Sequence, residues 1–393
     1  MLAQTLSTGE RLSLITRGLP AVSGTDEIQA ILTEGSRSPK GIWVTVPTGR
    51  PHLGYVVPLL KMVDFLRAGV DFNVCLGDIY GFLINFKYPI SQVEQRKRFY
   101  KFVLGAVFDA IGVPASSLPF VDESSYAYTP RHIMDMYRLS ALSSQRQLRE
   151  TGDEVGVSTM FGPMLTPILQ ALDEEYQGSD FDFGGLDQAG YFRVLPFASR
   201  LTICKRGLFE FAEELLPKMG YKKRAHLMND MLPGLNGGKM SASLPDSKID
   251  CLDSPETIRN KIMAVQCREG DAKTNGLLAI VRLILIPLNR LRLERSWGEI
   301  GYSLTEGRGV PESPPYAGPT GTVFTMSVDG TTKHYQTYLE IEQEYTQLQS
   351  HEAFKNAVSE SVVQILAPVR ESYSRNPDWQ AAEKLAYPEG EEE

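Results

Sequence analysis

The sequence predicts an α/β fold: a Rossmann-like, doubly wound parallel sheet forms the first domain, and an all-helical C-terminal domain follows it. Two observations predict this fold. Residues 41–80 read as a strand, a helix and a second strand, and the last eighty residues return to amphipathic helical spacing. We expect the first domain over residues 1–235 with a helical insertion at about 91–165, a linking loop over 236–252, and the helical domain over 253–393.

The strand–helix–strand unit rests on a change of hydrophobic period. IWVTV (42–46) is a β-branched and aromatic run that PTGRP interrupts, which is typical of a short strand. From 52 to 67 apolar residues recur every three or four positions until Gly69, which predicts a helix, and DFNVCLGD (71–78) is the next strand. Ligands bind beyond the carboxyl ends of such strands, which indicates a site that contains Thr48, Gly49, His52 and Asp78.

The remaining elements follow from the same reasoning. Residues 91–150 and 163–176 read as helices, whereas SDFDFGGLDQ (179–188) is interpreted as leading into a loop. From Ser254 the pattern is helical to about residue 300, and a Gly/Pro-rich stretch (298–322) is predicted to be a loop or an insertion.

Composition limits the function classes. A chain of 393 residues with 42% hydrophobic and 22% charged residues suits a globular protein of two domains. A net charge of −8 argues against a protein that coats DNA or RNA generally, but it allows a local basic face for one folded RNA.

Cysteine usage and hydropathy indicate the compartment. The four cysteines have no CxxC pairing and no zinc spacing, which favours free thiols in a reducing compartment, the cytoplasm. The N-terminus does not resemble a secretory signal. The most apolar run, 276–288, is too short to span a bilayer and contains Arg282, so we expect no membrane partner.

Two short stretches have the chemistry of a phosphate site. In PTGRPHLGY (47–55), a glycine turn and His52 stand at a helix start, where free N–H groups and the helix dipole favour an anion, and Gly54 leaves room for a flat ring. In LNGGKMSASLPDSKID (235–250), two glycines precede Lys239, Ser241 and Ser243, which are donors to an anion. Each stretch alone is more often an ordinary cap or surface turn, but their occurrence in one chain favours the phosphate site.

These residues carry a family resemblance. His52-Leu53-Gly54-Tyr55 resembles the HIGH element of class I aminoacyl-tRNA synthetases, and Lys239-Met240-Ser241-Ala242-Ser243 resembles their KMSKS element. The tyrosyl branch in its eukaryotic cytosolic, fungal-like form is the most similar, because it typically has an aromatic residue at the fourth HIGH position and a small residue in place of the second KMSKS lysine. The similarity covers nearly the whole chain and includes LQALDEEY, FGGLDQ and RAHLMN.

The resemblance implies a reaction in two steps. An amino-acid carboxylate attacks the α-phosphorus of ATP, which gives an aminoacyl-adenylate and pyrophosphate, and the aminoacyl group then passes to the 3′-terminal adenosine of a tRNA. His52 and Lys239 would stabilise the transition state with help from Thr48, Ser241 and Ser243. The ATP-binding residues implied are Gly49, His52, Gly54, Tyr55, Lys239 and Met240. Mg²⁺ would bridge the phosphates without dedicated protein ligands.

The resemblance also implies partners. The C-terminal helical domain would read the anticodon of a tRNA, and Trp297 is a candidate stacking residue there. The family is dimeric, so a homodimer is expected, with contributions from helices near 91–140. No DNA partner is implied.

The amino-acid pocket departs from the family pattern. The aspartate that normally holds the tyrosine phenol is present as Asp173, but the partner tyrosine is replaced by Ile42. The two glutamines that hold the amino group are present as Gln170 and Gln188, but the accompanying tyrosine is replaced by Thr166. Asp78 is a further candidate amino-acid-binding residue. Such hydrogen bonds decide specificity, and tyrosyl enzymes are themselves the known example of rejecting the analogue that lacks the hydroxyl.

Several interpretations stay open at this point. The segment AGYFRVLPFASRLTI (189–203) follows Gln188 where the family usually continues into a basic helix, and it is a lineage feature, a rebuilt pocket wall or translated intron sequence. The leading hypothesis is tyrosine activation and tRNA charging. The alternatives are a paralogue that uses another amino acid or a non-tRNA acceptor, and an inactive RNA-binding scaffold, which the intact His52 and Lys239 disfavour.

Overall fold

The computed structural model describes residues 6–85, 88–188, 207–235, 237, 247–267, 272, 275–296 and 319–388. Its centre is a six-stranded sheet with the order β1-β6-β5-β2-β3-β4. The strands are β1 (Ala21–Ser23), β2 (Lys40–Thr45), β3 (Asp71–Leu76), β4 (Phe120–Asp122), β5 (Phe181–Gly185) and β6 (Ala225–Asn229). Strands β2 to β6 are parallel, and only β1 at the edge runs antiparallel to its neighbour.

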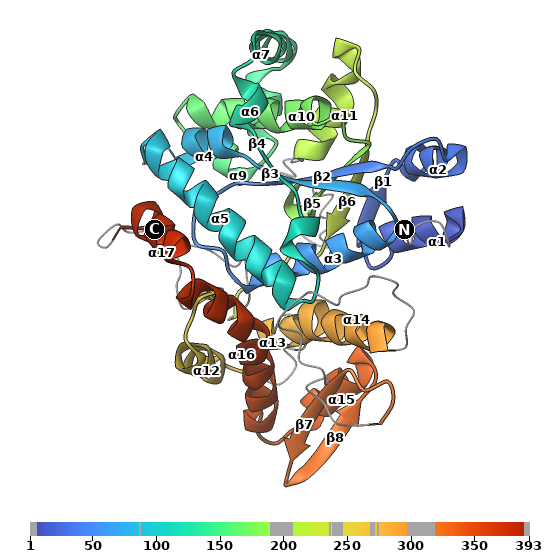
Figure 1. Cartoon of the computed structure of the whole chain (residues 1–393), viewed down its shortest axis with the longest axis vertical. Coiled ribbons are helices and arrows are strands. Elements are labelled where there is room, and N and C mark those ends of the chain that lie inside the picture. Colours follow the sequence, from blue (N-terminus) through green and yellow to red (C-terminus); the bar gives the residue numbers. More distant parts are fainter. Residues whose placement is uncertain are drawn as a thin grey trace, which may run out of the picture.

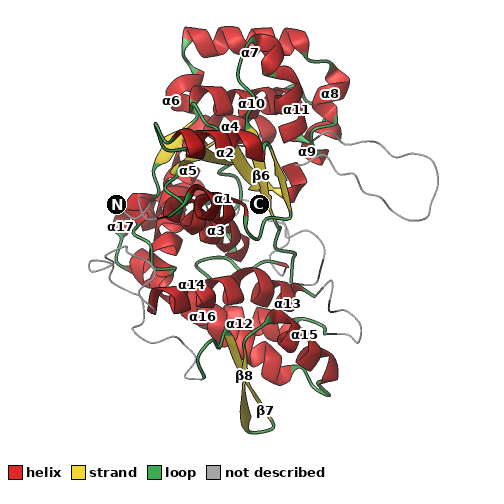
Figure 2. Cartoon of the chain, turned by 90° about the vertical axis from the view of Figure 1, so that its right-hand side faces the viewer, coloured by secondary structure: helices red, strands yellow, loops and turns green. Residues whose placement is uncertain are grey.

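Helices cover both faces of this sheet (Figures 1 and 2). On one face lie α1 (Thr8–Thr16), α3 (Val56–Arg67) and α5 (Ile90–Ala110). The other face is covered by α4 (Asp78–Asn85), α6 (Ser124–Ala127), α7 (Pro130–Leu142), α10 (Thr166–Tyr176) and α11 (Leu208–Leu215), with the short helices α8 (Gln145–Arg149) and α9 (Asp153–Gly156) beside them and α2 (Thr25–Glu34) near the β1 edge. This layering confirms the predicted doubly wound α/β fold.

The predicted strand–helix–strand unit is present with small changes at its ends. Strand β2 begins at Lys40, and its residues pair in parallel with Asp71–Leu76 of β3. The helix predicted from residue 52 starts as a 3₁₀ turn over Leu53–Tyr55 and becomes α3 only at Val56. The site-forming end of the unit is therefore a tight turn.

Strand β5 lies within SDFDFGGLDQ (179–188), a stretch that was expected only to lead into a loop. Phe181 and Phe183 are fully buried against Phe65 of α3, whereas Asp182 between them faces the opposite layer. The flanking Ser, Asp and Gly residues resemble a turn in sequence, but burial on both faces makes this segment a central strand.

The C-terminal part is mainly helical and also contains a hairpin that the sequence analysis did not predict. Its helices are α12 (Pro255–Ala264), α13 (Gly276–Ile280), α14 (Ile286–Ser296), α15 (Tyr338–Gln347), α16 (Glu352–Ser374) and α17 (Pro377–Ala386), and a π-helical turn over Val281–Leu285 joins α13 to α14. The hairpin pairs β7 (Phe324–Val328) with β8 (Thr331–Tyr335). Asp329 and Gly330 between them have φ of 51° and 76°, which suits a tight two-residue turn.

The end of the chain returns to the first part of the molecule. Helices α16 and α17 pack along α5, and Trp379 of α17 is buried against Phe99 and Phe102 (Figure 1). In the described part of the chain, no helix has the length and apolar character needed to cross a membrane. The domain boundaries expected at 235 and 253 remain a prediction.

Candidate functional site

The histidine of the predicted phosphate site caps the turn after β2. His52 directly precedes the 3₁₀ turn, and its Nδ1 accepts the backbone N–H of Gly54 at 3.2 Å. Because Nδ1 accepts this hydrogen bond, the proton of the neutral ring is on Nε2, and the Nε2–H group can donate a hydrogen bond to a ligand. Burial, with a smaller effect of Lys248, lowers the pKa of His52 to about 4. At neutral pH the side chain is therefore a neutral N–H donor.

The small residue in the same motif makes room for this ring. A Cβ on Gly54 would lie 2.8 Å from Cε1 and 2.9 Å from Nδ1 of His52, closer than real Cβ contacts allow. The absence of a Cβ at Gly54 thus makes room for the imidazole, and the room expected there for a flat ligand ring stays a prediction. Tyr55 points into the core, where its hydroxyl lies 3.2 Å from that of Tyr100 and its ring packs edge-on against Trp43.

Side chains that are distant in sequence donate hydrogen bonds to the backbone carbonyls of the glycine turn. The Tyr100 hydroxyl donates to the Gly49 carbonyl at 2.6 Å, and Arg96 Nη1 donates to the Thr48 carbonyl at 2.9 Å. The hydroxyl of Tyr387, which follows α17, lies 3.2 Å from the Thr48 carbonyl oxygen and 3.0 Å from that of Gly49. Sequence reasoning missed these three residues because no short-range pattern links them to the turn.

The arm that follows the second predicted motif lies beside His52. The Leu53 N–H donates to the Ile249 carbonyl at 2.8 Å, and the Cys251 N–H donates to the Pro51 carbonyl at 3.2 Å. The Leu235 N–H donates to Ser247 at 2.9 Å, which ties together the two arms of the intervening loop. Lys239, Met240, Ser241 and Ser243 lie outside the described residues, but the arm that leads out of their loop is hydrogen-bonded to the histidine turn.

Helix α10 gathers the predicted amino-acid-binding residues. Thr166, Gln170 and Asp173 follow at intervals of four and three residues, so they share one face, and all three are buried. Thr166 Oγ1 donates to the Pro163 carbonyl at 2.8 Å. Gln188 ends the 3₁₀ turn Leu186–Gln188 after β5, and its side chain lies outside what the structure describes, as does the segment 189–203.

Ile42 lies on the same side of the sheet as this helix face. It forms a small buried cluster with Val44 and Cys75, and the ring of Tyr126 from α6 packs against that cluster. The Tyr126 hydroxyl donates to Asp173 Oδ1 at 2.6 Å and lies 3.3 Å from Cys75 Sγ. A tyrosine hydroxyl therefore reaches the predicted phenol-binding aspartate, but it comes from α6 and not from residue 42.

Buried carboxylates surround this aspartate. Burial first, and then repulsion from Glu123, raises the pKa of Asp173, and burial followed by repulsion from Glu174 raises that of Asp182. Burial also raises the pKa of Glu123 to about 8. Asp182 stands opposite Ile42 on the neighbouring strand, and neither of its oxygens has a hydrogen-bond partner among the described residues.

One buried cation partly offsets these charges. His226 of β6 lies between two carboxylates, 3.0 Å from Glu174 Oε1 and 2.8 Å from Glu213 Oε1. Burial opposes its protonation, but the two carboxylates outweigh that effect and raise the pKa of His226 to about 10. The ring is therefore an imidazolium at neutral pH. It is hydrogen-bonded to one oxygen of Glu174 and to neither oxygen of Asp182.

Asp78 has a different surrounding from the one expected. The sequence analysis named it as an amino-acid-binding residue, yet its Oδ2 lies 2.7 Å from Lys97 Nζ and accepts the Ser124 hydroxyl at 2.6 Å. Its Oδ1 accepts the N–H groups of Ile79 and Ser124. Asp78 thus ties α4, α5 and α6 together, and its contact with an amino acid stays a prediction.

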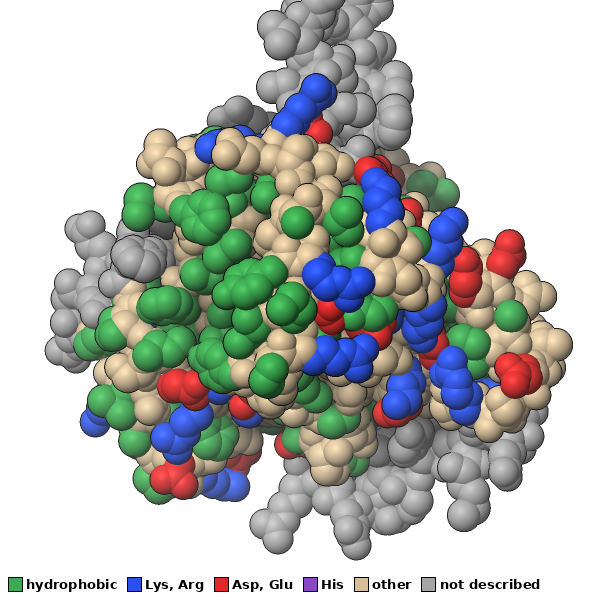
Figure 3. Space-filling model, turned by 90° about the horizontal axis from the view of Figure 1, so that it is seen from above, with side chains coloured by type: hydrophobic (Ala, Val, Ile, Leu, Met, Phe, Trp, Pro, Cys, Tyr) green, Lys and Arg blue, Asp and Glu red, His purple; other side chains and the backbone are tan. Residues whose placement is uncertain are grey.

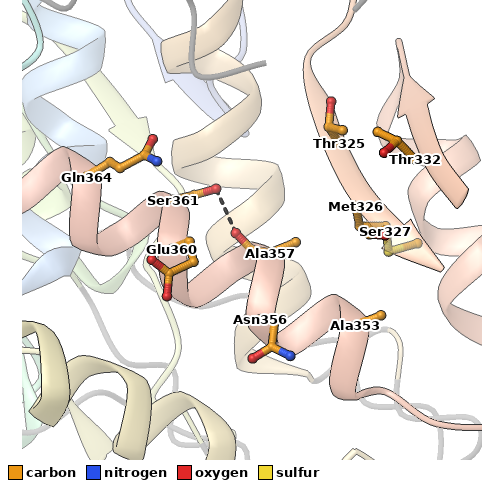
Figure 4. A pocket seen from close by; sticks show the side chains of 10 residues that line it. All are labelled: Thr325, Met326, Ser327, Thr332, Ala353, Asn356, Ala357, Glu360, Ser361 and Gln364. Carbon is orange, nitrogen blue, oxygen red and sulfur yellow. Dashed lines mark hydrogen bonds between the residues drawn. The ribbon is translucent and has the colours of Figure 1, made fainter. Parts of the chain in front are cut away.

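A hollow lies in the C-terminal part, between the hairpin and α16 (Figure 4). Ser361 Oγ donates there to the Ala357 carbonyl at 2.8 Å, and Glu360 is paired with Arg259 at 2.6 Å. The hollow has both polar and apolar side chains and is lined by Thr325, Met326, Ser327, Thr332, Ala353, Asn356, Ala357, Glu360, Ser361 and Gln364. The candidate stacking residue Trp297 lies outside the described residues.

Comparisons with known proteins agree with this geometry. A family model described as tRNA synthetases class I (W and Y) matches residues 36–296. The cytoplasmic tyrosine--tRNA ligase of Saccharomyces cerevisiae is 36% identical over 98% of this chain and 90% of the relative. That of Gallus gallus is 35% identical over 96% of this chain, which spans only 63% of that longer relative.

Solved structures are similar over nearly the same length. The tyrosyl-tRNA synthetase of Archaeoglobus fulgidus, complexed with L-tyrosine, superimposes on this chain with a TM-score of 0.71 at 25% identity. The match covers 93% of this chain and 99% of the Archaeoglobus chain. The Pyrococcus horikoshii enzyme gives a TM-score of 0.77 at 19% identity over 96% and 99% of the two chains, which supports the fold. The chain therefore belongs to the class I tRNA synthetase family of the W and Y type, as a eukaryotic-type member of its tyrosyl branch.

Proposed function

We propose that this protein activates tyrosine with ATP and transfers it to the 3′ end of its cognate tRNA. The observation that carries the proposal is the His52 turn beyond the carboxyl end of β2, in a chain of the tyrosyl branch that has the buried Asp173 on α10. The relatives are named cytoplasmic ligases, and we propose the same compartment for this protein.

The ATP half of the reaction uses alignment and hydrogen bonding. His52 Nε2–H donates to a phosphate oxygen on which negative charge builds in the transition state, and Lys239 from the adjoining loop supplies a positive charge. Thr48, Ser241 and Ser243 assist, and Gly49, Gly54, Tyr55 and Met240 complete the ATP site, partly through the shape of the turn. Mg²⁺ enters with ATP and bridges its phosphates.

The amino-acid half lies under α10. Asp173 accepts the phenol of tyrosine, and Gln170 and Gln188 hold the amino group. Ile42 and Thr166 shape the apolar wall, since both are buried and Thr166 has its own bond to Pro163. Asp78 acts mainly through α4 and α6, which it fixes in place.

The tRNA half extends into the C-terminal part. We propose that this part reads the anticodon and that the hollow between the hairpin and α16 accepts a base, with Trp297 as a stacking partner. Hydroxyl and amide side chains such as Ser327, Thr332 and Asn356 can donate and accept hydrogen bonds, as base edges require.

An apolar surface supports the expected homodimer. Tyr128, Met134 and Tyr137 on and next to α7 are 57–65% exposed, and Phe161 is 71% exposed. Figure 3, which views the molecule from the α7 end, shows hydrophobic side chains gathered on this face. A patch of this kind marks a contact surface, and a second copy of the chain is the partner that we propose for it.

Pyrophosphate exchange tests the proposed function. The purified protein is assayed for amino-acid-dependent exchange between ATP and pyrophosphate with each of the twenty amino acids. We expect exchange with tyrosine alone, followed by charging of tyrosine tRNA. Exchange only with another amino acid would indicate a paralogue, and no exchange with retained tRNA binding would indicate a scaffold, so either result contradicts the proposal.

A further inference from the structure

The family's phenol site has a tyrosine hydroxyl beside the aspartate, and Ile42 at that position cannot supply it. Ile42 has no polar side chain, it is 1% exposed, and it packs against Val44 and Cys75. A lone aspartate in this apolar surrounding tends to take up a proton, because burial raises its pKa. A protonated, freely rotating carboxyl would be a poor acceptor for a phenol, so a second group is needed to fix it.

Tyr126 is in position to be this second group. Its hydroxyl donates to Asp173 Oδ1 at 2.6 Å and is itself approached by Gln177 Nε2 at 3.3 Å. A donor to one oxygen favours the ionised form of Asp173 and fixes the plane of its carboxylate. The second oxygen then remains as the acceptor for an incoming O–H group.

The ring of Tyr126 is held firmly. It stacks on Tyr176 with an interplanar angle of 16° and a centroid distance of 5.9 Å, and it lies 5.8 Å from the ring of His132. The Tyr126 N–H also donates to the Glu123 carbonyl at 3.2 Å at the start of α6. Aromatic packing on one side and the Ile42 cluster on the other leave the hydroxyl a single well-defined direction.

We propose that Tyr126 is a specificity-determining residue, whose hydroxyl positions Asp173 for the substrate phenol and replaces the tyrosine that is absent at position 42. This inference rests on the proposed activation of tyrosine.

The test compares tyrosine with phenylalanine in the Tyr126→Phe variant. We expect the ratio of kcat/KM for tyrosine over phenylalanine to fall about 3- to 10-fold in pyrophosphate exchange, mainly through a higher KM for tyrosine, while the KM for ATP stays unchanged. Tyr176→Phe is the matched control, because its hydroxyl belongs to the same aromatic stack but donates to Asp135 at 2.8 Å. We expect this control to keep the ratio within about twofold.

Three outcomes would overturn the inference, and two of them come from kinetics of the Tyr126→Phe variant. One is an unchanged ratio in Tyr126→Phe. The other is an equal loss with tyrosine, phenylalanine and ATP, which would indicate general distortion. Calorimetric binding of tyrosinol and phenylalaninol separates this inference from the proposed function. A wild-type protein that prefers tyrosinol but shows no exchange would refute the function and leave the Tyr126 effect measurable by binding, whereas no preference for tyrosinol would refute the inference.

Discussion

The two halves of the site satisfy their polar groups in opposite ways. In the ATP turn, the carbonyls of Thr48 and Gly49 accept hydrogen bonds from Tyr100, Arg96 and Tyr387. Next to Asp173, in the proposed amino-acid pocket, both oxygens of Asp182 and one of Glu123 are buried without a partner among the described residues. Each buried polar group without a hydrogen bond costs about 1–3 kcal/mol of folding free energy. The pocket therefore destabilises the folded protein, whereas the turn does not.

This difference separates preorganisation from recognition. A turn whose backbone is fixed by the protein needs no reorganisation when phosphate charge develops. Buried carboxyl groups without partners, in contrast, favour a ligand that brings polar groups, and the phenol and ammonium groups of tyrosine are such groups. The comparison therefore predicts that mutations in the turn reduce the rate, whereas mutations in the pocket change stability and selectivity.

The largest effect is expected at the donor of the turn. His52→Ala removes a hydrogen bond to the transition state, and we expect kcat for tyrosine-dependent exchange to fall about 100-fold with little change in the KM for tyrosine. His334→Ala, on the hairpin, is the control and should keep the wild-type rate. An equal fall in both variants would show that the loss is not specific to the turn.

The same residue makes a prediction about pH. The pKa of His52 is about 4 in the folded protein, so the wild-type rate should show no step near pH 6.5 that depends on this residue. Profiles of kcat/KM from pH 5.5 to 8.5 check this. A step near 6.5 that disappears in His52→Ala would contradict the neutral-donor assignment.

An intermediate effect, on stability, is expected in the pocket. The folded protein raises the pKa of Asp182, so it binds a proton that the unfolded chain has released, and the free energy of unfolding falls as pH rises above about 4. Asp182→Asn removes this loss, and we expect a gain of about 1–3 kcal/mol at pH 8 and a smaller gain at pH 5. Urea unfolding at both pH values measures the change.

The control for this experiment is an exposed aspartate. Asp26→Asn, in the first turn of α2, should leave the difference between the two pH values unchanged. If Asp182→Asn gives the same gain at pH 5 and pH 8, the burial of a charge at this position is not the cause.

The smallest effect is expected at the support of the turn. Tyr387→Phe removes one hydroxyl under Thr48 and Gly49, and we expect the KM for ATP to rise about 2- to 5-fold while the KM for tyrosine stays the same. Tyr335→Phe, on β8, serves as the comparison and should change neither constant. A rise confined to the KM for tyrosine would contradict the assignment of this turn to ATP and of the pocket to the amino acid.

Short-range patterns explain what the sequence could predict. The change from strand to helical spacing over residues 41–80 predicted β2, α3 and β3, and the motif at 47–55 predicted the turn of His52. Strand β5 was missed because SDFDFGG has turn-forming residues, and its burial depends on both layers of helices. The hairpin was missed because five residues per strand give a weak alternating pattern.

Residues that act across the fold have no such signal. Tyr126 reaches Asp173 over 47 positions, and no spacing rule links them. The departure at Ile42 was visible in the sequence, but the side chain that packs beside it could be found only once α6 was placed against the sheet. Asp182 likewise reads as one of several acidic residues until its burial is known.

The contact of Tyr387 with the glycine turn has a consequence for protein synthesis. This hydroxyl is added to the growing chain 339 positions after Thr48, so the ribosome makes the HIGH-like turn long before the group that supports it. A nascent chain can form the sheet and the histidine cap early, but its ATP turn gains the last support only when α17 has docked on α5. Proteolytic trimming within α17 would therefore loosen the ATP turn without touching any residue of the amino-acid pocket.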